Sequence, residues 1–260
     1  MLNVINESST RIKTGIVLFI AIFIIGYIDS YFVFWLVFGI MLLISISEAK
    51  KLFGIKNDII FVYTTLLWIA AYFYPKPEDL IFIVAIAYAS QLAYKKTLNT
   101  NVFLPLLYPT ASFLFLLSLY SEYGTMTLLW LLVIVASTDI GAYFVGRLWG
   151  KNKLCPSLSP QKTVEGAIAG FIGAVCASIA IHKLAVYMQA EWFHLSFSEA
   201  VWLGMLIGIL GQIGDLAESL LKRDAAVKDS NALPGLGGVL DMVDSLLFTT
   251  PIVYFFLRMH

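Results

Sequence analysis

The sequence predicts an all-α, polytopic membrane protein of about nine transmembrane helices with a cytoplasmic N-terminus. Of its 260 residues, 60% are hydrophobic and only 13% are charged. So little polar sequence cannot cover the core of a soluble protein of this size. Many apolar runs approach the roughly 20 residues that a helix needs to cross a bilayer. The basic residues also gather on one side of these runs. A soluble domain is therefore excluded.

The apolar runs define the expected spans in chain order. We place them at about 14–28, 31–47, 59–74, 80–94, 102–120, 127–146, 165–182, 200–218 and 243–258. Residues 15–47 are too long for one span, and Asp29 with Ser30 supplies a hairpin between two shorter ones. Arg11 and Lys13 before the first run resemble the start of a signal peptide. No small-residue cleavage site follows, so we expect an uncleaved helix, with a cleaved signal as the alternative.

The distribution of charge predicts the orientation. With the N-terminus inside, all but three of the 17 basic residues lie on the inner side, the exceptions being Lys76, Lys183 and Arg258. This is the positive-inside asymmetry of membrane proteins. We therefore predict a multi-pass protein of the cell inner (cytoplasmic) membrane. The net charge is zero, so the protein has no overall positive field that would attract nucleic acid, and we expect no nucleic-acid partner.

The two halves of the chain differ in polarity. Residues 1–125 form an almost purely hydrophobic transmembrane scaffold, whereas 126–260 carry polar segments on the inner side and acids inside apolar helices. We therefore expect a catalytic region with a cytoplasm-facing site in 126–260. Cys155 and Cys176 have neither metal-ligand nor disulfide spacing, and we interpret both as structural.

The first polar pattern is a stripe within the sixth span. Asp139, Tyr143 and Arg147 recur at four-residue steps and so share one helix face. An acid inside a membrane span is expensive, and it suggests a site lined by water, ions or partner groups. A polar stripe that only packs helices together is the alternative.

A sharper pattern closes the eighth span. Asp215, Glu218 and Lys222 stand at i, i+3 and i+7, an arrangement that runs from acid at membrane depth to base at the cytoplasmic edge. Such a stripe suits a magnesium ion below and anionic phosphates above, because magnesium prefers carboxylate and water oxygens and is commonly shared with phosphates. A solvated helix end is the alternative, but it leaves Asp215 unexplained.

A glycine-rich loop follows. Residues 233–238 read Leu-Pro-Gly-Leu-Gly-Gly, and such a backbone can approach a ligand closely and form an anion-binding concavity. Lys228 precedes this loop, and Asp241 and Asp244 follow it, three residues apart on one face of the last helix. The combination indicates a phosphate and metal site. An ordinary turn before a helix is the alternative.

The third element is residues 159–166, Ser-Pro-Gln-Lys-Thr-Val-Glu-Gly. We expect it to open the seventh helix, with Pro160 and Thr163 near the start and Glu165 in the first turn. A helix N-terminus offers free N–H groups to an anion, and Lys162 adds a full charge. Helix capping alone would explain the serine, threonine and glutamate, but not Lys162.

Together these elements resemble the phosphatidate cytidylyltransferase family, also called CDP-diacylglycerol synthases. The resemblance covers roughly residues 130–258. It is carried by 159–166, Gly-Asp-Leu-Ala-Glu-Ser at 214–219, Leu-Lys-Arg at 221–223, Lys-Asp at 228–229, and Pro-Gly-Leu-Gly-Gly-Val-Leu-Asp-Met-Val-Asp-Ser at 234–245. Leu236 and Met242 replace a histidine and an arginine of the common signature, and the stretch before Pro234 is one residue short. We interpret the chain as one of a subfamily in which other groups do those two jobs.

The resemblance implies a reaction of phosphatidate with CTP that gives CDP-diacylglycerol and diphosphate. The implied cofactor is Mg²⁺, with a second divalent or a monovalent cation as a further candidate. The implied partners are CTP, phosphatidate in the inner leaflet and membrane lipid, and a homodimer is a further candidate. We assign catalysis to Asp215, Asp244 and Lys222. We assign metal binding to Asp215, Asp241 and Asp244. We assign substrate binding to Ser159, Lys162, Glu218, Arg223, Lys228, Asp229, Gly237 and Gly238.

Three other functions compete with this interpretation. A CTP-dependent lipid kinase of the dolichol or phytol type needs similar phosphate chemistry, but the motifs at 214–219 and 234–238 argue against it. A CDP-alcohol phosphotransferase would carry a spaced Asp-Gly-x-x-Ala-Arg signature, which is absent from the sequence. An ion-coupled transporter would often show inverted repeats. Here the first half lacks the polar residues of the second.

Overall fold

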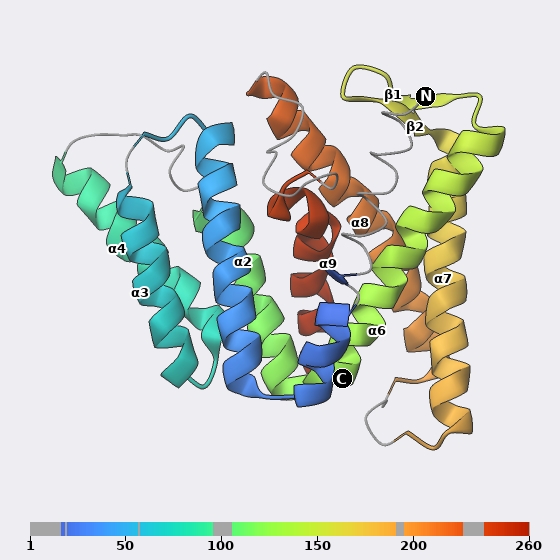
Figure 1. The fold of residues 1–260 in the computed structure, drawn as a ribbon, viewed down its shortest axis with the longest axis horizontal. Coiled ribbons are helices and arrows are strands. Elements are labelled where there is room, and N and C mark those ends of the chain that lie inside the picture. The colour runs from blue at the N-terminus through green and yellow to red at the C-terminus, as the bar shows by residue number, and fades with distance from the viewer. Residues whose placement is uncertain are drawn as a thin grey trace. The chain divides into compact units, whose positions relative to one another are not determined.

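The computed structural model describes residues 17–18, 20–56, 58–95, 106–190, 195–225 and 237–259, and these are almost entirely helical (Figure 1). Residues 20–28 form the first helical stretch. The other elements are α2 (Tyr31–Leu52), α3 (Ile59–Phe73), a 3₁₀ turn (Pro77–Asp79), α4 (Leu80–Lys95), a π-helical turn (Leu106–Ala111), α6 (Ser112–Trp149), β1 (Lys153–Cys155), β2 (Ser159–Thr163), α7 (Val164–Tyr187), α8 (Phe197–Asp224) and α9 (Val239–Met259).

The described helices follow the expected apolar runs, and the predicted all-α membrane fold is confirmed. Among the residues that the structure describes, five helical stretches are long and apolar enough to cross a membrane: Tyr31–Leu52, Leu107–Trp149, Val164–Tyr187, Phe197–Asp224 and Val239–Met259. The longest of them joins the expected fifth and sixth spans. Gly124 breaks its helical backbone with φ 77° and ψ 176°, close to the predicted turn.

The chain divides into two compact units. The first comprises Met1–Ser118 with Asp224–Val243, and the second comprises Leu119–Arg223 with Asp244–His260. The boundaries pass through α6, between Ser118 and Leu119, and through α9, between Val243 and Asp244, so both of these helices contribute to both units. Each unit therefore combines segments that lie far apart in the sequence.

In the first unit, α2 and α3 pack through two tryptophans. The indole Nε1 of Trp35 donates to the carbonyl of Trp68 at 2.8 Å, and that of Trp68 donates to the carbonyl of Trp35 at 3.1 Å. Buried indole N–H groups need acceptors, and this reciprocal pair satisfies both. Gly39 on α2 leaves room for the Trp68 ring, because a Cβ there would collide with it.

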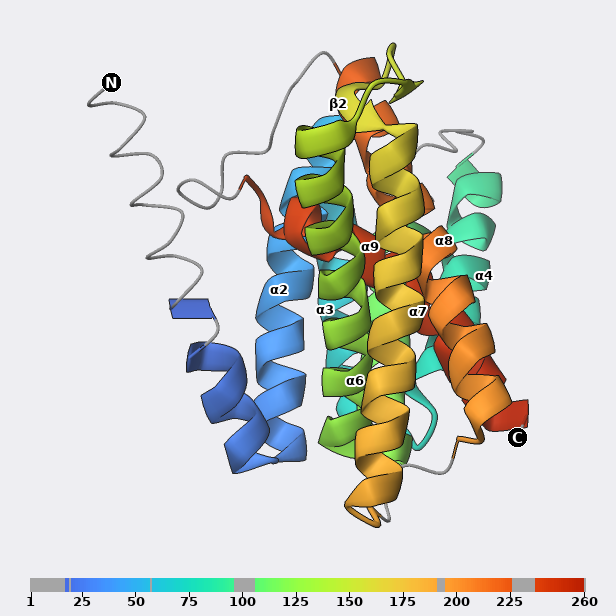
Figure 2. The same ribbon diagram turned by 90° about the vertical axis from the view of Figure 1, so that its right-hand side faces the viewer.

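In the second unit, α6 and α7 run side by side along small residues (Figure 2). A Cβ on Gly141 would lie 2.9 Å from the carbonyl oxygen of Ala169, and one on Gly170 would lie 2.8 Å from that of Thr138. Small residues allow helix backbones to approach closely in a membrane, where dispersion contacts drive helix association. This seam therefore depends on glycine at both positions.

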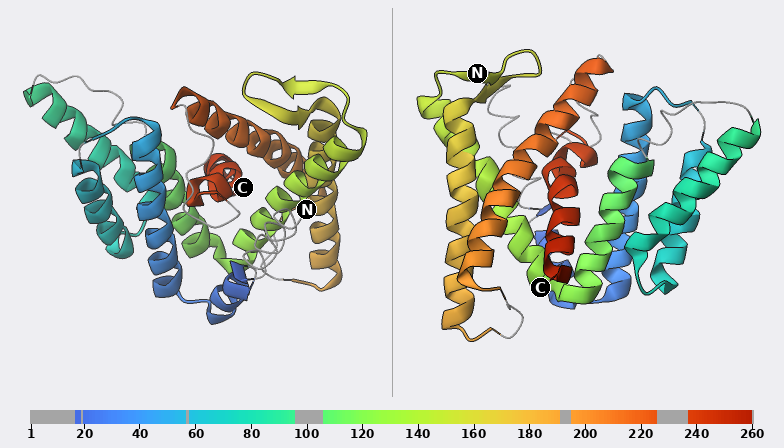
Figure 3. Two further views of the ribbon diagram at one scale, coloured as in Figure 1. Left: turned by 45° about the horizontal axis from the view of Figure 1, so that its top comes forward. Right: turned by 180° about the vertical axis from the view of Figure 1, so that it is seen from behind.

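Helix α8 packs against α7 and against the part of α9 that belongs to the second unit (Figure 3). Ser178 on α7 donates its hydroxyl to the carbonyl of Ala200 at 2.6 Å, and Gln212 Nε2 donates to the carbonyl of Ala167 at 3.1 Å. On the other side, the hydroxyl of Ser245 on α9 donates to the carbonyl of Gly211 at 3.0 Å. Polar side chains inside this unit are thus satisfied by backbone carbonyls of the neighbouring helix.

A small antiparallel hairpin precedes α7, with Lys153 opposite Thr163 and Cys155 opposite Ser159. The expectation that Pro160 lies near the start of the seventh helix is therefore wrong, since Ser159–Thr163 is a strand and the helix begins at Val164. Proline disfavours helical conformation in the residue before it and is tolerated at a strand edge. Both cysteines are free.

The start of α7 is capped as the sequence indicates. Thr163 accepts the backbone N–H of Gly166 at 3.2 Å through its hydroxyl. Glu165 has a role beyond its own helix, because its carboxylate accepts the N–H of Lys151 at 3.1 Å and the side-chain amide of Asn152 at 2.7 Å. The first turn of α7 therefore also holds the chain that leads into β1.

Candidate active site

Carboxylates from three helices of the second unit meet next to the hairpin. Asp215 lies on α8, Asp244 on α9 and Asp139 on α6, and Asp244 interacts electrostatically with both of the others. The backbones of α8 and α9 nearly touch here, since a Cβ on Gly214 would lie 2.8 Å from the carbonyl oxygen of Asp244. The structure thus brings together Asp215 and Asp244, which the sequence placed in one site from segments about 30 residues apart.

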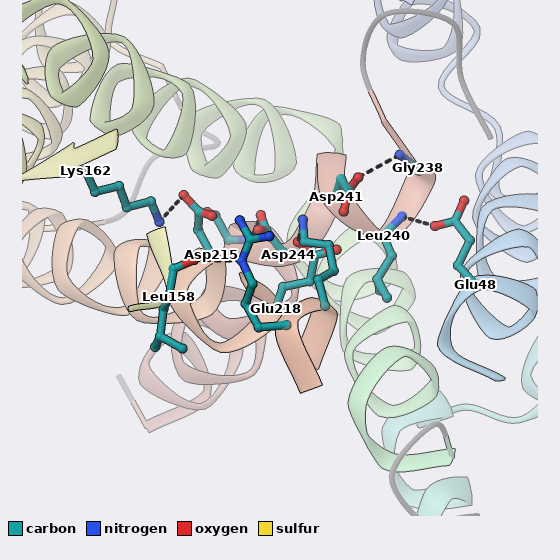
Figure 4. Close-up of polar contacts among 12 residues, drawn as sticks. Glu48, Leu158, Lys162, Asp215, Glu218, Gly238, Leu240, Asp241 and Asp244 are labelled. Carbon is teal, nitrogen blue, oxygen red and sulfur yellow. Dashed lines mark hydrogen bonds and ion pairs between the residues drawn. The ribbon is translucent and has the colours of Figure 1, made fainter. Parts of the chain in front are cut away.

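Lys162 is the cation of this cluster. Its ammonium group, on β2, forms an ion pair with the carboxylate of Asp215 (Figure 4). It also acts electrostatically on Asp139 and Asp244. The three carboxylates thus lie within electrostatic range of one another, although Asp244 is only 6% exposed. Like charges held this closely favour the binding of a further cation.

The carboxylates of Asp215 and Asp244 fit a magnesium ion that is shared with substrate. Carboxylate oxygens are the ligands that this ion prefers, and it commonly takes one or two of them together with waters and substrate phosphates. Within the described ranges, no group of three or more acidic, histidine or cysteine side chains is arranged to hold a metal ion by itself. Asp215 and Asp244 would therefore supply the protein ligands, and the substrates and water would supply the rest.

The stripe predicted on α8 is present. Glu218 is 1% exposed, and its Oε2 forms an ion pair with Nζ of Lys222, one helical turn later, at 2.6 Å. A buried carboxylate is stable only with such partners. Glu218 therefore holds Lys222 in place at the end of α8.

Arg223 links the end of α8 to the hairpin. Its Nε donates to the carbonyl of Leu158 at 3.2 Å, beside Ser159 at the start of β2. Ser159, Lys162 and Arg223 are therefore brought to one region of the second unit, near Asp215. The guanidinium carries five N–H donors in a fixed plane and suits phosphate recognition.

Two residues of the glycine-rich loop, Gly237 and Gly238, are described by the structure, and they belong to the first unit. Gly237 has φ 88°, a conformation that favours glycine, and a Cβ there would collide with the carboxylate of Asp241. Asp241 Oδ2 accepts the backbone N–H of Gly238 at 2.9 Å, which closes the start of α9 (Figure 4). A carboxylate has about four lone-pair sites, so this bond leaves capacity for another ligand. Lys228, Asp229 and Leu236 lie outside the described residues.

Sequence reasoning placed Asp139 in a polar stripe and did not include it among the site residues. In the structure Arg147 donates to the hydroxyl of Tyr143 at 2.6 Å, while Asp139 interacts with Asp215 and Lys162. The signal was present in the sequence, because a lone acid inside an apolar run has to find a polar environment. Met242, at one of the divergent positions, lies on α9 and is 36% exposed.

Sequence comparison agrees with this geometry. The model of the cytidylyltransferase family matches residues 9–260. A phosphatidate cytidylyltransferase of Helicobacter pylori is 39% identical over 244 residues, which are 93% of this chain and 89% of the relative. One from Bacillus subtilis is 42% identical over 139 residues, which are 53% of this chain and 49% of the relative. The match spans the scaffold as well as the polar half, and the chain therefore belongs to the cytidylyltransferase family.

Proposed function

We propose that this protein transfers a cytidylyl group from CTP to phosphatidate, giving CDP-diacylglycerol and diphosphate for phospholipid synthesis. The observation that carries this proposal is the meeting of Asp215, Asp244 and Lys162 in a multi-pass membrane protein of this family. Similarity to a phosphatidate cytidylyltransferase over 93% of this chain supports the choice of lipid substrate. The same cluster offers both an excess of acid for a metal and bases for phosphates.

The reaction joins two anions. An oxygen of the phosphatidate monoester attacks the α-phosphorus of CTP, a new P–O bond forms, and the bond to the β-phosphate breaks to release diphosphate. The lipid phosphate is already largely ionised, so no protein nucleophile is needed. A bound Mg²⁺ would screen the repulsion between the anions and stabilise charge on the reacting oxygens. A second cation remains a further candidate.

The residues divide this work by charge. Asp215 and Asp244 would hold the metal. The assignment of Asp241 as a further metal ligand stays a prediction, because this residue belongs to the first unit. Lys222 would neutralise reacting phosphate, and Glu218 orients it through their ion pair. The remaining substrate contacts are assigned to Ser159, Lys162, Arg223, Lys228, Asp229, Gly237 and Gly238. Lys162 already pairs with Asp215, so a cation that binds Asp215 would release this lysine toward phosphate.

Position-specific labelling of CTP tests the reaction. Purified protein incubated with phosphatidate, Mg²⁺ and α-³²P-labelled CTP should place the label in lipid and release diphosphate. With γ-labelled CTP the lipid should stay unlabelled and the diphosphate should carry the label. A lipid kinase would produce the reverse pattern, and label in lipid only from the γ-position would refute the proposal. A transporter would transfer label from neither position.

The orientation is part of the proposal, because CTP is cytosolic. We propose about nine spans in the cell inner membrane, with the N-terminus and the hairpin on the cytoplasmic side, and a homodimer stays a candidate for the oligomeric state. Cys155 on β1 offers a natural probe in a Cys176→Ser background. A membrane-impermeant maleimide should label it only after permeabilisation. The matched control is Lys76→Cys in a cysteine-free chain, which should react in intact cells. Labelling of Cys155 in intact cells would contradict the proposed orientation and indicate the opposite one.

A further inference from the structure

One buried acid of the scaffold contacts the element that follows the glycine-rich loop. Glu48 lies near the end of α2 and is 2% exposed. Its two carboxylate oxygens accept the backbone N–H groups of Val239 at 3.0 Å and Leu240 at 2.8 Å. Figure 4 shows the bond to Leu240. These bonds join residues 191 and 192 positions apart within the first unit. Glu48 therefore caps α9 from a distant segment.

The cap completes a set of three consecutive N–H groups. The first N–H groups of a helix have no partner inside the helix. Asp241 takes the N–H of Gly238, and Glu48 takes those of Val239 and Leu240. A negative charge at a helix N-terminus is also favoured by the helix dipole. The two carboxylates together determine where α9 begins.

This placement constrains the glycines directly before the helix. Gly237 keeps φ 88° beside the carboxylate of Asp241, and Gly238 is tied to the same carboxylate. If the first turn of α9 shifted, the backbone of both glycines would shift with it. In the proposed function these glycines let the backbone approach the nucleotide, so their position matters for CTP and not for the lipid tails.

We propose that Glu48 is a positioning residue for CTP, acting through the first turn of α9 on Gly237 and Gly238. This inference rests on the proposed function and extends it to the scaffold half. A neutral side chain at position 48 would not cap the helix equally well, because the Glu48 carboxylate presents two acceptor oxygens to the two backbone N–H donors. In glutamine one oxygen is replaced by an amide that is itself a donor, so one helix N–H would face another donor.

The Glu48→Gln variant tests the proposal, with Glu78→Gln as the matched control. Glu78 is also a buried glutamate of the first unit at 2% exposure, but it accepts the hydroxyl of Ser118 at 2.6 Å. For Glu48→Gln, we expect the KM for CTP to rise by about tenfold or more. Its KM for phosphatidate should stay within about twofold. Glu78→Gln should leave both KM values within about twofold, whatever it does to stability.

Folded, monodisperse protein from gel filtration is used throughout, and equilibrium binding of labelled CTP accompanies the kinetics. If Glu48→Gln does not fold, Glu48→Asp keeps both acceptors on a shorter side chain and should give a smaller rise in the same KM. An unchanged KM for CTP, or an equal rise in the Glu78 variant, would overturn the positioning role. Absence of both CTP binding and lipid product in the unsubstituted protein would instead refute the proposed function.

Discussion

Asp244→Asn and Asp215→Asn should each lower the rate of CDP-diacylglycerol formation by about a thousandfold or more. Metal-assisted stabilisation of reacting phosphates contributes several kcal/mol, and each 1.36 kcal/mol is a factor of ten in rate. Asparagine keeps the shape of aspartate and removes the charge that would hold the cation. Turnover is measured with labelled CTP in detergent or nanodiscs across a range of magnesium concentrations.

Asp244→Asn should not lose stability, and this separates a catalytic role from a structural one. Asp244 is 6% exposed and lies within electrostatic range of Asp215 and Asp139, so removing its charge relieves repulsion between like groups. We expect the Tm of Asp244→Asn to equal or exceed that of the unsubstituted protein. A gain in stability at the cost of activity is characteristic of strained active sites.

Asp58→Asn is the matched control for both substitutions. Asp58 forms an ion pair with Lys50 in the first unit, and its side chain is 83% exposed. An exposed ion pair contributes about 1 kcal/mol at most, so activity should remain close to normal. Near-normal turnover in Asp215→Asn or Asp244→Asn would remove these residues from the proposed metal site. A loss in Asp58→Asn as large as theirs would indicate a general effect of charge.

Gly214→Ala should separate the two helices that carry the acids. Its Cβ would lie 2.8 Å from the carbonyl oxygen of Asp244 and 3.0 Å from the ring of Phe248. The nearest atom is backbone, so α8 and α9 have to move apart. Overpacking of this kind costs about 1–3 kcal/mol. We expect a lower Tm and at least about a tenfold loss of activity, because a small misplacement of reacting groups is costly.

Gly211→Ala tests whether this effect is steric. Gly211 lies three residues earlier on α8, and a Cβ there would find its nearest neighbour, Ser245 Cβ, at 3.6 Å, an ordinary contact. Alanine favours a helix over glycine by up to about 1 kcal/mol, so this variant should be neutral or more stable. Thermal unfolding in detergent and lipid product are measured for both. Equal behaviour of the two alanine variants would contradict the steric argument.

The sequence by itself predicted the helices and the chemical character of the site. Bilayer thickness sets the length of an apolar run, so the positions of α2, α7, α8 and α9 follow from local composition. The spacing of Asp215, Glu218 and Lys222 places them on one face of α8, because helix periodicity is also a local property. The break between the fifth and sixth apolar runs was predicted in the same way, and the structure places it at Gly124.

Tertiary structure decided which distant groups meet. Lys162 pairs with Asp215 from a strand of the hairpin, in a segment that the sequence predicted as the start of a helix. The sequence of one strand does not reveal its partner, because the hydrogen bonds of a strand are made with another segment of the chain. Glu48 lies in the half that the sequence predicts to be a hydrophobic scaffold, but its carboxylate caps the first turn of α9. Periodicity reports which residues share a face of one element. The partner that this face finds is set by packing between elements, which no local pattern contains.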